Sequence, residues 1–222
     1  MRVRLPENSV MRAVLVAMVA SAQIALAQTQ TLTFDDLPNP LITEGGSVGY
    51  ITNGYAGFQW DNFDYNYPAL GGIRGNTNST GYQNGLVSSP YVAFNGYGGP
   101  ARISGRLFNL DSAYLTAAWN DGLQVEVLGS LEGVLIYDNT YTAETSSPVP
   151  INFNYLGIDS VTFISTGGTP NVRYGGAYGT QFVLDNLTVT LVPEPSFPAM
   201  IALVLSALFS LRKRRPDASV VA

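Results

Sequence analysis

The feature that most restricts the fold of this chain is an alternation of apolar and polar residues with a period of two, which extends from Thr29 to Leu191. This is the period of a β-strand with one buried face. Turn-forming pairs interrupt it at short intervals, among them Asn-Gly at 53–54 and 95–96 and Glu-Gly at 132–133. No stretch between them shows a convincing helical period. The pattern therefore predicts an all-β domain.

The alternating segments are short and numerous, as in a sandwich of two antiparallel sheets. A chain of 222 residues can hold one such domain with sequence to spare at both ends. We expect a two-sheet jelly-roll β-sandwich over residues 28–191. Its expected strands are residues 30–37, 58–67, 91–95, 101–110, 113–119, 123–129, 133–141, 151–155, 160–166 and 181–191.

The composition of this domain excludes several classes of function. Residues 28–192 contain four arginines, no lysine and thirteen acidic residues, which gives a formal net charge of −9. Such a surface cannot neutralise a row of phosphates, so nucleic acid is not expected as a partner. The chain has no cysteine and no histidine. Disulfides, Cys/His zinc sites and histidine-dependent catalytic triads are therefore excluded.

No arrangement of residues in the sequence indicates catalysis. A glycosidase needs two carboxylates about 5 to 10 Å apart across a cleft. Asp61 and Asp64 are three residues apart in one expected strand and fit a solvent-facing surface, and spacing singles out no pair. The chain also lacks a Gly-x-Ser-x-Gly motif and a glycine-rich loop that leads into a helix. We predict that the protein is not an enzyme.

The N-terminus has the three parts of a secretory signal peptide. Three arginines lie within residues 2–12, an apolar region covers 13–27, and Ala-Leu-Ala at 25–27 is a small-x-small cleavage motif. We predict that signal peptidase removes residues 1–27 and that the remaining chain is exported. Met11 is an alternative start, because Met11 and Arg12 alone would still give a basic beginning.

The C-terminus combines a proline-containing triplet, an apolar run and a basic cluster within residues 192–215. The apolar run, 197–211, would span about 22 Å as a helix, which is short of a hydrocarbon core of about 30 Å. We expect a short transmembrane helix, with the basic cluster on the cytoplasmic side and the domain outside. The triplet is Pro193, Glu194 and Pro195, and the cluster is Arg212, Lys213, Arg214 and Arg215.

In this order, these three elements resemble the PEP-CTERM sorting signal of Gram-negative bacteria that make exopolysaccharide. The resemblance implies an exosortase-type membrane protease as a partner, a precursor held transiently in the inner membrane, and release to the cell surface or extracellular matrix. It covers residues 192–215 and leaves 216–222 as a tail. Two prolines would hold the cleavage region extended. A permanent membrane anchor is the alternative.

One carboxylate is expected to point into the core. Asp185 shares parity with Val183 and Leu187 in the last expected strand. An unpaired buried carboxylate is costly, so Asp185 needs an arginine, a cation or hydrogen-bond donors as a partner. If the first and last strands pair, Asp35 or Asp36 would lie near it. Calcium, which prefers hard oxygen ligands, could then bind there.

The segments "TFDDL" at 33–37 and "FVLDNLTV" at 182–189 resemble the terminal strands of galactose-binding-like carbohydrate-binding modules. That resemblance implies a structural calcium held by Asp35, Asp36 and Asp185. Plain capping or hydrogen bonding by these aspartates is the alternative, and the motifs are short.

The segment at 58–67 changes phase within its length. Phe58 and Trp60 share one parity, whereas Phe63 and Tyr65 have the other, so the alternation shifts at 61–62. A β-bulge there would re-aim the side chains, either beside a binding site or at a sheet edge.

Aromatic side chains give a motive for glycan binding, since sugars pack against ring faces next to planar polar groups. The predicted glycan-facing residues are Trp60, Tyr65 and Trp119. The alternative is that the rings are buried and only their polar tips reach water. Further tyrosines in Gly- and Asn-rich loops suggest a sugar-facing rim; they are Tyr50, Tyr55, Tyr82, Tyr91, Tyr97, Tyr174 and Tyr178.

Together these patterns predict an exported, non-catalytic surface or matrix protein that is sorted by its C-terminus. The alternative is a carbohydrate-binding module for the cell's own exopolysaccharide. A polysaccharide-acting hydrolase is the third and least supported hypothesis.

Overall fold

The computed structural model describes residues 26–43, 46–68 and 80–193, and residues Ala27–Val192 form one compact unit. The predicted signal peptide up to residue 25, the apolar run and the basic cluster lie outside the described residues, as do Glu194 and Pro195. No helix within the three described ranges is long and apolar enough to cross a membrane.

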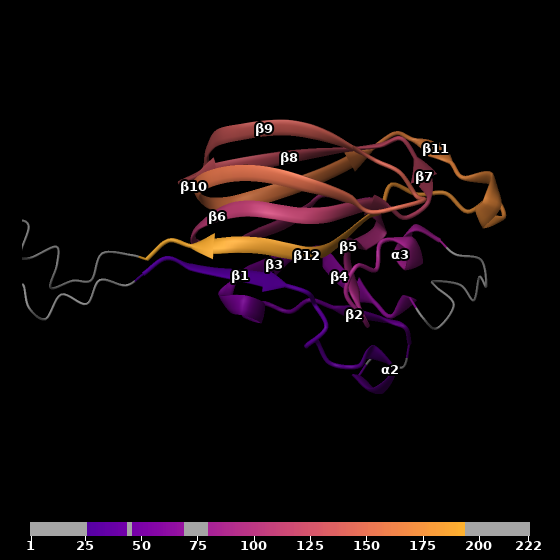
Figure 1. Cartoon of the computed structure of the whole chain (residues 1–222), viewed down its shortest axis with the longest axis horizontal. Helices are drawn as coiled ribbons and strands as arrows, with labels where there is room; N and C mark the ends of the chain where they lie inside the picture. Colours follow the sequence, from indigo (N-terminus) through magenta and orange to yellow (C-terminus); the bar gives the residue numbers. More distant parts are fainter. Residues whose placement is uncertain (1–25, 44–45, 69–79, 194–222) are drawn as a thin grey trace, which may run out of the picture. The chain divides into compact units, whose positions relative to one another are not determined.

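The regular structure of the described chain is mostly β-strand with little helix, which confirms the predicted class (Figure 1). Five strands are long: β6 (Ala101–Ala117), β8 (Leu123–Leu131), β9 (Val134–Ala143), β10 (Val149–Thr166) and β12 (Phe182–Leu191). The short strands are β1 (Gln28–Leu32), β2 (Val48–Tyr50), β3 (Gln59–Asp61), β4 (Phe63–Asn66), β5 (Val92–Asn95), β7 (Asn120–Asp121) and β11 (Thr169–Pro170). The helical pieces are single turns: α2 (Pro40–Thr43), α3 (Gly81–Asn84), η1 (Tyr55–Gly57), η3 (Gly96–Gly98) and η4 (Val172–Tyr174).

Hydrogen bonds join ten of these strands into one antiparallel sheet, where the sequence predicts two separate sheets. Its order is β2-β4-β5-β12-β6-β10-β8-β9, with β1 added to β12 and β3 added to β6, and β7 and β11 form a separate pair. The continuity comes from β6 and β10, each of which unites two of the expected strands. Shifts of register between these two strands fall at left-handed residues such as Gly105 (φ 112°) and Gly157 (φ 64°). Bulges of this kind bend a strand without ending it.

The phase change predicted at 61–62 is present, but it is a change of partner strand. Asn62 adopts a left-handed conformation (φ 55°) between β3 and β4. Before it, β3 pairs with β6, and after it, β4 pairs with β2 and β5. The turn at Asn62 therefore divides the expected strand into two halves that pair with different strands of the sheet.

The first and last strands pair, as predicted. In β1 and β12, Gln28 lies opposite Leu191 and Leu32 lies opposite Leu187 (Figure 1). The hydroxyls of Thr29 and Thr190 approach to 2.7 Å across the pair. The chain therefore enters and leaves the domain side by side.

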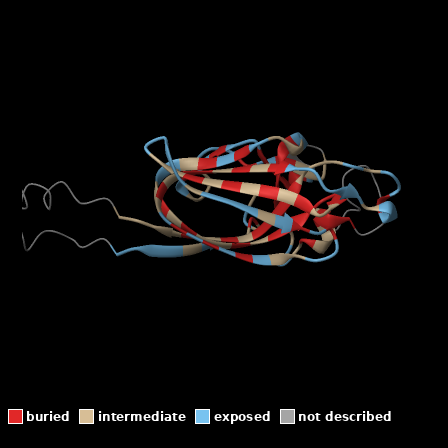
Figure 2. Cartoon of the chain, turned by 90° about the horizontal axis from the view of Figure 1, so that it is seen from above, coloured by how far each residue is buried: buried red, intermediate tan, exposed pale blue. Residues whose placement is uncertain are grey.

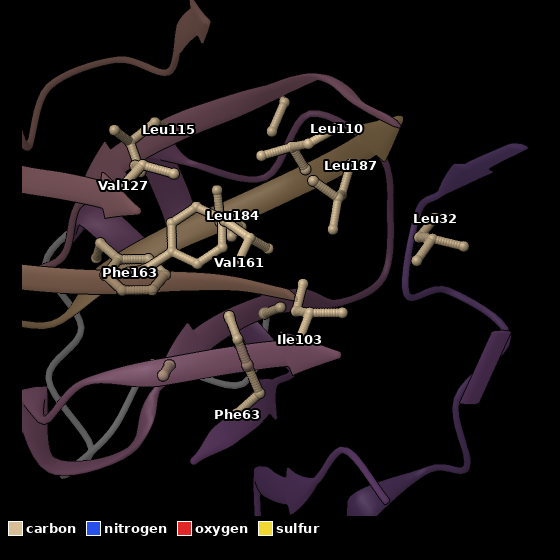
Figure 3. Packing of buried hydrophobic residues seen from close by; sticks show 14 of the residues in the cluster. Leu32, Phe63, Ile103, Leu110, Leu115, Val127, Val161, Phe163, Leu184 and Leu187 are labelled. Atoms are coloured by element: carbon tan, nitrogen blue, oxygen red, sulfur yellow. The ribbon is translucent and has the colours of Figure 1, made fainter. Parts of the chain in front are cut away.

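The main core lies on the inner face of the sheet. Buried and exposed residues alternate along the long strands, as the period of two requires (Figure 2). Phe63 of β4 packs edge-on against Phe163 of β10, with ring centroids 6.0 Å apart, and the core continues through Ile103 and Leu184 (Figure 3).

A second, smaller cluster lies on the other face of one part of the sheet. It contains Tyr82, Val92, Phe94, Ala118, Trp119, Tyr174 and Val183. In β5, Ala93 belongs to the main core, whereas Val92 and Phe94 belong to the second cluster. This part of the sheet is therefore buried on both faces.

Candidate functional site

A cavity of about 460 Å³ opens beside the second cluster, at the end of the domain where β2, β4, β5 and α3 lie (Figure 1). Aromatic residues predominate in its lining: Tyr50, Tyr82, Phe94, Tyr97, Trp119 and Tyr178. Asp64 and Gln181 also line it, and the other lining residues are small or aliphatic. Small-ligand pockets are usually concave and rich in aromatic side chains, with a small number of polar groups.

Strand pairing places Asp64 in this cavity. Tyr50 of β2 lies opposite Asp64, and Asp64 lies opposite Phe94 of β5. Directly opposed residues project from the same face of a sheet, so these three side chains form one row. The alternate residues Phe63 and Tyr65 project from the other face into the main core.

The carboxyl group of Asp64 has little contact with solvent and no positively charged partner among the described residues. The residue is 9% exposed, and burial raises the pKa of its carboxyl to about 6. Among the described residues no hydrogen bond to this carboxylate is formed, and no basic residue lines the cavity. At neutral pH the group is therefore mostly ionised and unpaired. A titratable group perturbed by burial inside a cleft is a candidate functional residue.

Three exposed tyrosines form the rim of the cavity. Tyr97 is 95% exposed, Tyr178 is 79% exposed and Tyr50 is 63% exposed. Large aromatic rings on the surface of a domain are free to contact a ligand, and rings gathered around one opening are typical of a binding site.

The turn that carries Tyr97 is held firmly in place. Tyr97 has φ 54°, and the Asn62 amide group donates to the Gly96 carbonyl oxygen at 3.1 Å. The Gly96 N–H donates in return to the Asn62 carbonyl oxygen at 3.0 Å. A methyl group on Gly96 would lie 3.1 Å from Asp64 Oδ2, so this glycine allows the turn to approach the carboxylate.

The floor of the cavity is a packed aromatic group. Tyr82 of α3 meets Phe94 edge-on at 5.1 Å and Trp119 edge-on at 5.6 Å. Burial raises the pKa of the Tyr82 hydroxyl, and the charge of Asp64 adds to that effect. Tyr82 therefore stays neutral, and the packed rings of the floor carry no charge.

Backbone hydrogen bonds fix the loop that forms the remaining wall. The Asn171 N–H donates to the Trp119 carbonyl oxygen at 2.9 Å. The Ala118 N–H donates to the Gln181 carbonyl oxygen at 2.9 Å. The side-chain oxygen of Gln181 is buried and has no hydrogen-bond partner among the described residues. This oxygen is a buried acceptor next to the cavity and is not exposed to it.

The structure corrects two of the three residues predicted to face a glycan. Trp60 is buried in the main core, and its indole N–H donates to the Tyr55 carbonyl oxygen at 3.0 Å. Tyr65 is also buried there, and its hydroxyl donates to the Pro38 carbonyl oxygen at 2.6 Å. Both rings fill the core because β3 and β4 turn these positions inward. Trp119 lines the cavity, although only 6% of it is exposed.

The loop tyrosines divide in the same way. Tyr55 and Tyr91 pack on or within the main core, and Tyr174 belongs to the second cluster. The other four, Tyr50, Tyr82, Tyr97 and Tyr178, line the cavity. Sequence reasoning missed Asp64, which fits a solvent-facing strand position by pattern alone.

Asp185 is fully buried, as predicted, and hydrogen-bond donors surround it. The N–H groups of Val87 and Ser88 donate to its carboxylate at 2.7 and 2.8 Å. The Ser88 hydroxyl and the Asn186 N–H add bonds of 3.0 and 2.7 Å. Burial raises the pKa of Asp185, and these donors oppose the shift. The partner that the carboxylate requires is thus a loop of the chain itself.

The structure does not gather Asp35, Asp36 and Asp185 into a cation site. Asp35 accepts from the Tyr91 N–H at 3.0 Å, and Asp36 accepts from the Tyr55 hydroxyl at 2.8 Å at the edge of another open hollow. In the described part of the chain, no group of three or more acidic, histidine or cysteine side chains lies together. Calcium binding stays a prediction, tested by a melting curve with and without a chelator.

Comparison with known proteins found matches among solved structures. No protein-family model and no curated protein matches the sequence. Among solved structures, TmCBM61 in complex with β-1,4-galactotriose is similar over 71% of this chain and 99% of its own, with 9% identity and a TM-score of 0.32. CBM51 from Clostridium perfringens GH95 in complex with methyl-galactose is similar over 73% and 99%, with 11% identity and a TM-score of 0.32. These scores are too low for either ligand to be transferred to this chain.

Proposed function

We propose that this protein is an exported, non-catalytic saccharide-binding protein whose ligand occupies the cavity between Tyr50, Tyr97 and Tyr178. The observation that carries the proposal is the cavity itself: aromatic rings surround one buried carboxylate that has no partner among the described residues. Its volume of about 460 Å³ falls within the common range for small-ligand sites, about 300 to 1,000 Å³.

The chemistry of the lining suits a sugar. The C–H face of a pyranose ring is apolar and packs against an aromatic face, while its hydroxyls need hydrogen-bond acceptors. The exposed tyrosines supply faces, and Asp64 supplies an acceptor. The described residues contribute a single carboxylate to the lining, and they do not supply the pair of acids that glycoside hydrolysis requires.

The proposal includes the export and the cell-surface sorting that are predicted from the two ends of the chain. Removal of residues 1–27 by signal peptidase would export the domain. An exosortase-type protease would act near Pro193, Glu194 and Pro195 and leave the protein at the cell surface or in the matrix, where exopolysaccharide is the nearest glycan. Mass spectrometry of the mature termini tests this part: a mature form that still carries residues 212–215 would indicate a permanent anchor.

A glycan array on the secreted chain tests saccharide binding, and a double variant tests whether the rim tyrosines contact the ligand. Tyr97→Ala and Tyr178→Ala together remove two rim rings that are mostly exposed, so the fold should not change. We expect binding to weaken at least tenfold. The exposed Val172, which lies outside the cavity lining, serves for comparison as Val172→Ala. No binding by the parent chain to any glycan, at millimolar concentration, would refute the proposal.

A further inference from the structure

Resting on the saccharide-binding function proposed above, we infer that the cavity selects an amino sugar with a free, protonated amine. Its ammonium group would lie beside Asp64 and among the aromatic rings. Neutral or N-acetylated sugars of the same size would bind more weakly.

The charge balance of the cavity is the first reason. Among the described residues that line the cavity, Asp64 is the only charged one; it is largely shielded from water and receives no hydrogen bond from them. A buried charge without a partner is unfavourable. A neutral hydroxyl would satisfy one lone pair and leave the charge in place. An ammonium group would neutralise the charge and also donate hydrogen bonds.

The aromatic lining is the second reason. The face of an aromatic ring carries partial negative charge and attracts a cation within about 6 Å of its centre. Trp119, Tyr97 and Tyr178 line the same cavity as Asp64. Several rings and one carboxylate form the combination by which proteins recognise organic ammonium groups.

The charge of the whole domain is the third reason. Residues 28–192 carry a formal net charge of −9, with four arginines and no lysine. Such a domain repels polysaccharides that carry uronate, phosphate or sulfate groups and attracts cationic ones. A cationic amino-polysaccharide is therefore the glycan class that matches both the cavity and its surroundings.

A metal ion fits the cavity less well than an organic cation. Calcium binds six to eight oxygen ligands, often from more than one carboxylate. Within the described part of the chain, Asp64 is the only carboxylate that lines this cavity. The aromatic rings of the lining would also contribute nothing to the binding of an ion that makes no contact with ring faces.

Isothermal titration of the secreted chain at pH 7 tests the inference with two matched ligands. These are the tetramer of glucosamine and the tetramer of N-acetylglucosamine, which differ only in the acetyl groups on their amines. We expect the glucosamine tetramer to bind at least tenfold more tightly. In Asp64→Asn this preference should disappear, whereas Asp61→Asn, a substitution at an exposed position of β3, should keep it.

The outcomes separate this inference from the proposed function. Equal affinity for both tetramers, or an Asp64→Asn variant with its preference intact, overturns the inference. If neutral glycans then still bind and the tyrosine double variant weakens them, the proposed function stands alone. Binding of neither tetramer overturns the inference, and an empty glycan array in addition overturns both. A tetralysine peptide that binds as tightly as the glucosamine tetramer would also overturn it, because the sugar would then contribute nothing.

Discussion

Replacing Asp64 with asparagine should make the unliganded protein more stable at neutral pH. The amide has nearly the same shape as the carboxylate but no charge, so it removes the cost of a buried, uncompensated anion. Burial raises the pKa of Asp64 from its ordinary value of 3.8 to about 6. A difference of about two in pKa corresponds to about 3 kcal/mol of unfolding free energy. Because the cavity opens to solvent, we expect about 1 to 2 kcal/mol at pH 7.

The effect should depend on pH in a defined direction. A carboxyl with a raised pKa contributes its full stability below its unfolded value, near pH 4, and loses it as the pH rises through about 6. Asp64→Asn and the parent should therefore have equal stability near pH 4. The variant should gain its advantage between pH 4 and 7.

Urea unfolding followed by tryptophan fluorescence, at pH 4, 5, 6 and 7, measures this difference. Asp61→Asn is the matched control, because Asp61 is exposed and should shift stability by less than about 0.5 kcal/mol at every pH. If Asp64→Asn is less stable than the parent at pH 7, or its advantage does not vary with pH, then Asp64 already has a partner in the folded protein. The reasoning on the cavity would then fail.

Three further substitutions test the supports of the fold and of the site. Asp185→Asn should destabilise the protein by about 2 to 4 kcal/mol in urea unfolding, because an amide cannot accept all four hydrogen bonds that the carboxylate accepts. Gly81→Ala should lower the melting temperature by at least about 5 °C, because the added methyl group would overlap the Ala117 carbonyl oxygen. Gly96→Ala should weaken saccharide binding at least fivefold in calorimetry, with a smaller effect on stability, because the methyl group would displace the Asn62 side chain and move the turn that carries Tyr97.

Much of the framework follows from local sequence. The period of two predicts the strands, and the parity of Asp185 predicts a buried carboxylate in need of a partner. Pairing of the terminal strands was also predictable, because a strand at each end of a β-domain must be covered or paired. The sequence does not show that the partner of Asp185 is the backbone at 87–88, since nothing local links two segments almost a hundred residues apart.

The site was harder to predict because β4 is buried on both faces. Parity shows that Asp64 and Tyr65 point in opposite directions, but it does not show which direction leads to the core. The strands that pair with β4 decide this, since they place Tyr65 against Tyr91 and Asp64 beside Tyr50. An acidic residue between two aromatic core positions is the signal that was available.

The pairing of β1 with β12 also determines what the domain can reach. The cavity lies near Gln181, at the start of β12, and the chain leaves the domain after Leu191, at its end. Ten residues of strand separate the two points by roughly 30 Å. Because Gln28 lies opposite Leu191, both chain ends leave from the same side of the domain, far from the cavity (Figure 1). A protein tethered by its C-terminus would therefore have its binding site about the length of β12 away from the point where the chain leaves the domain.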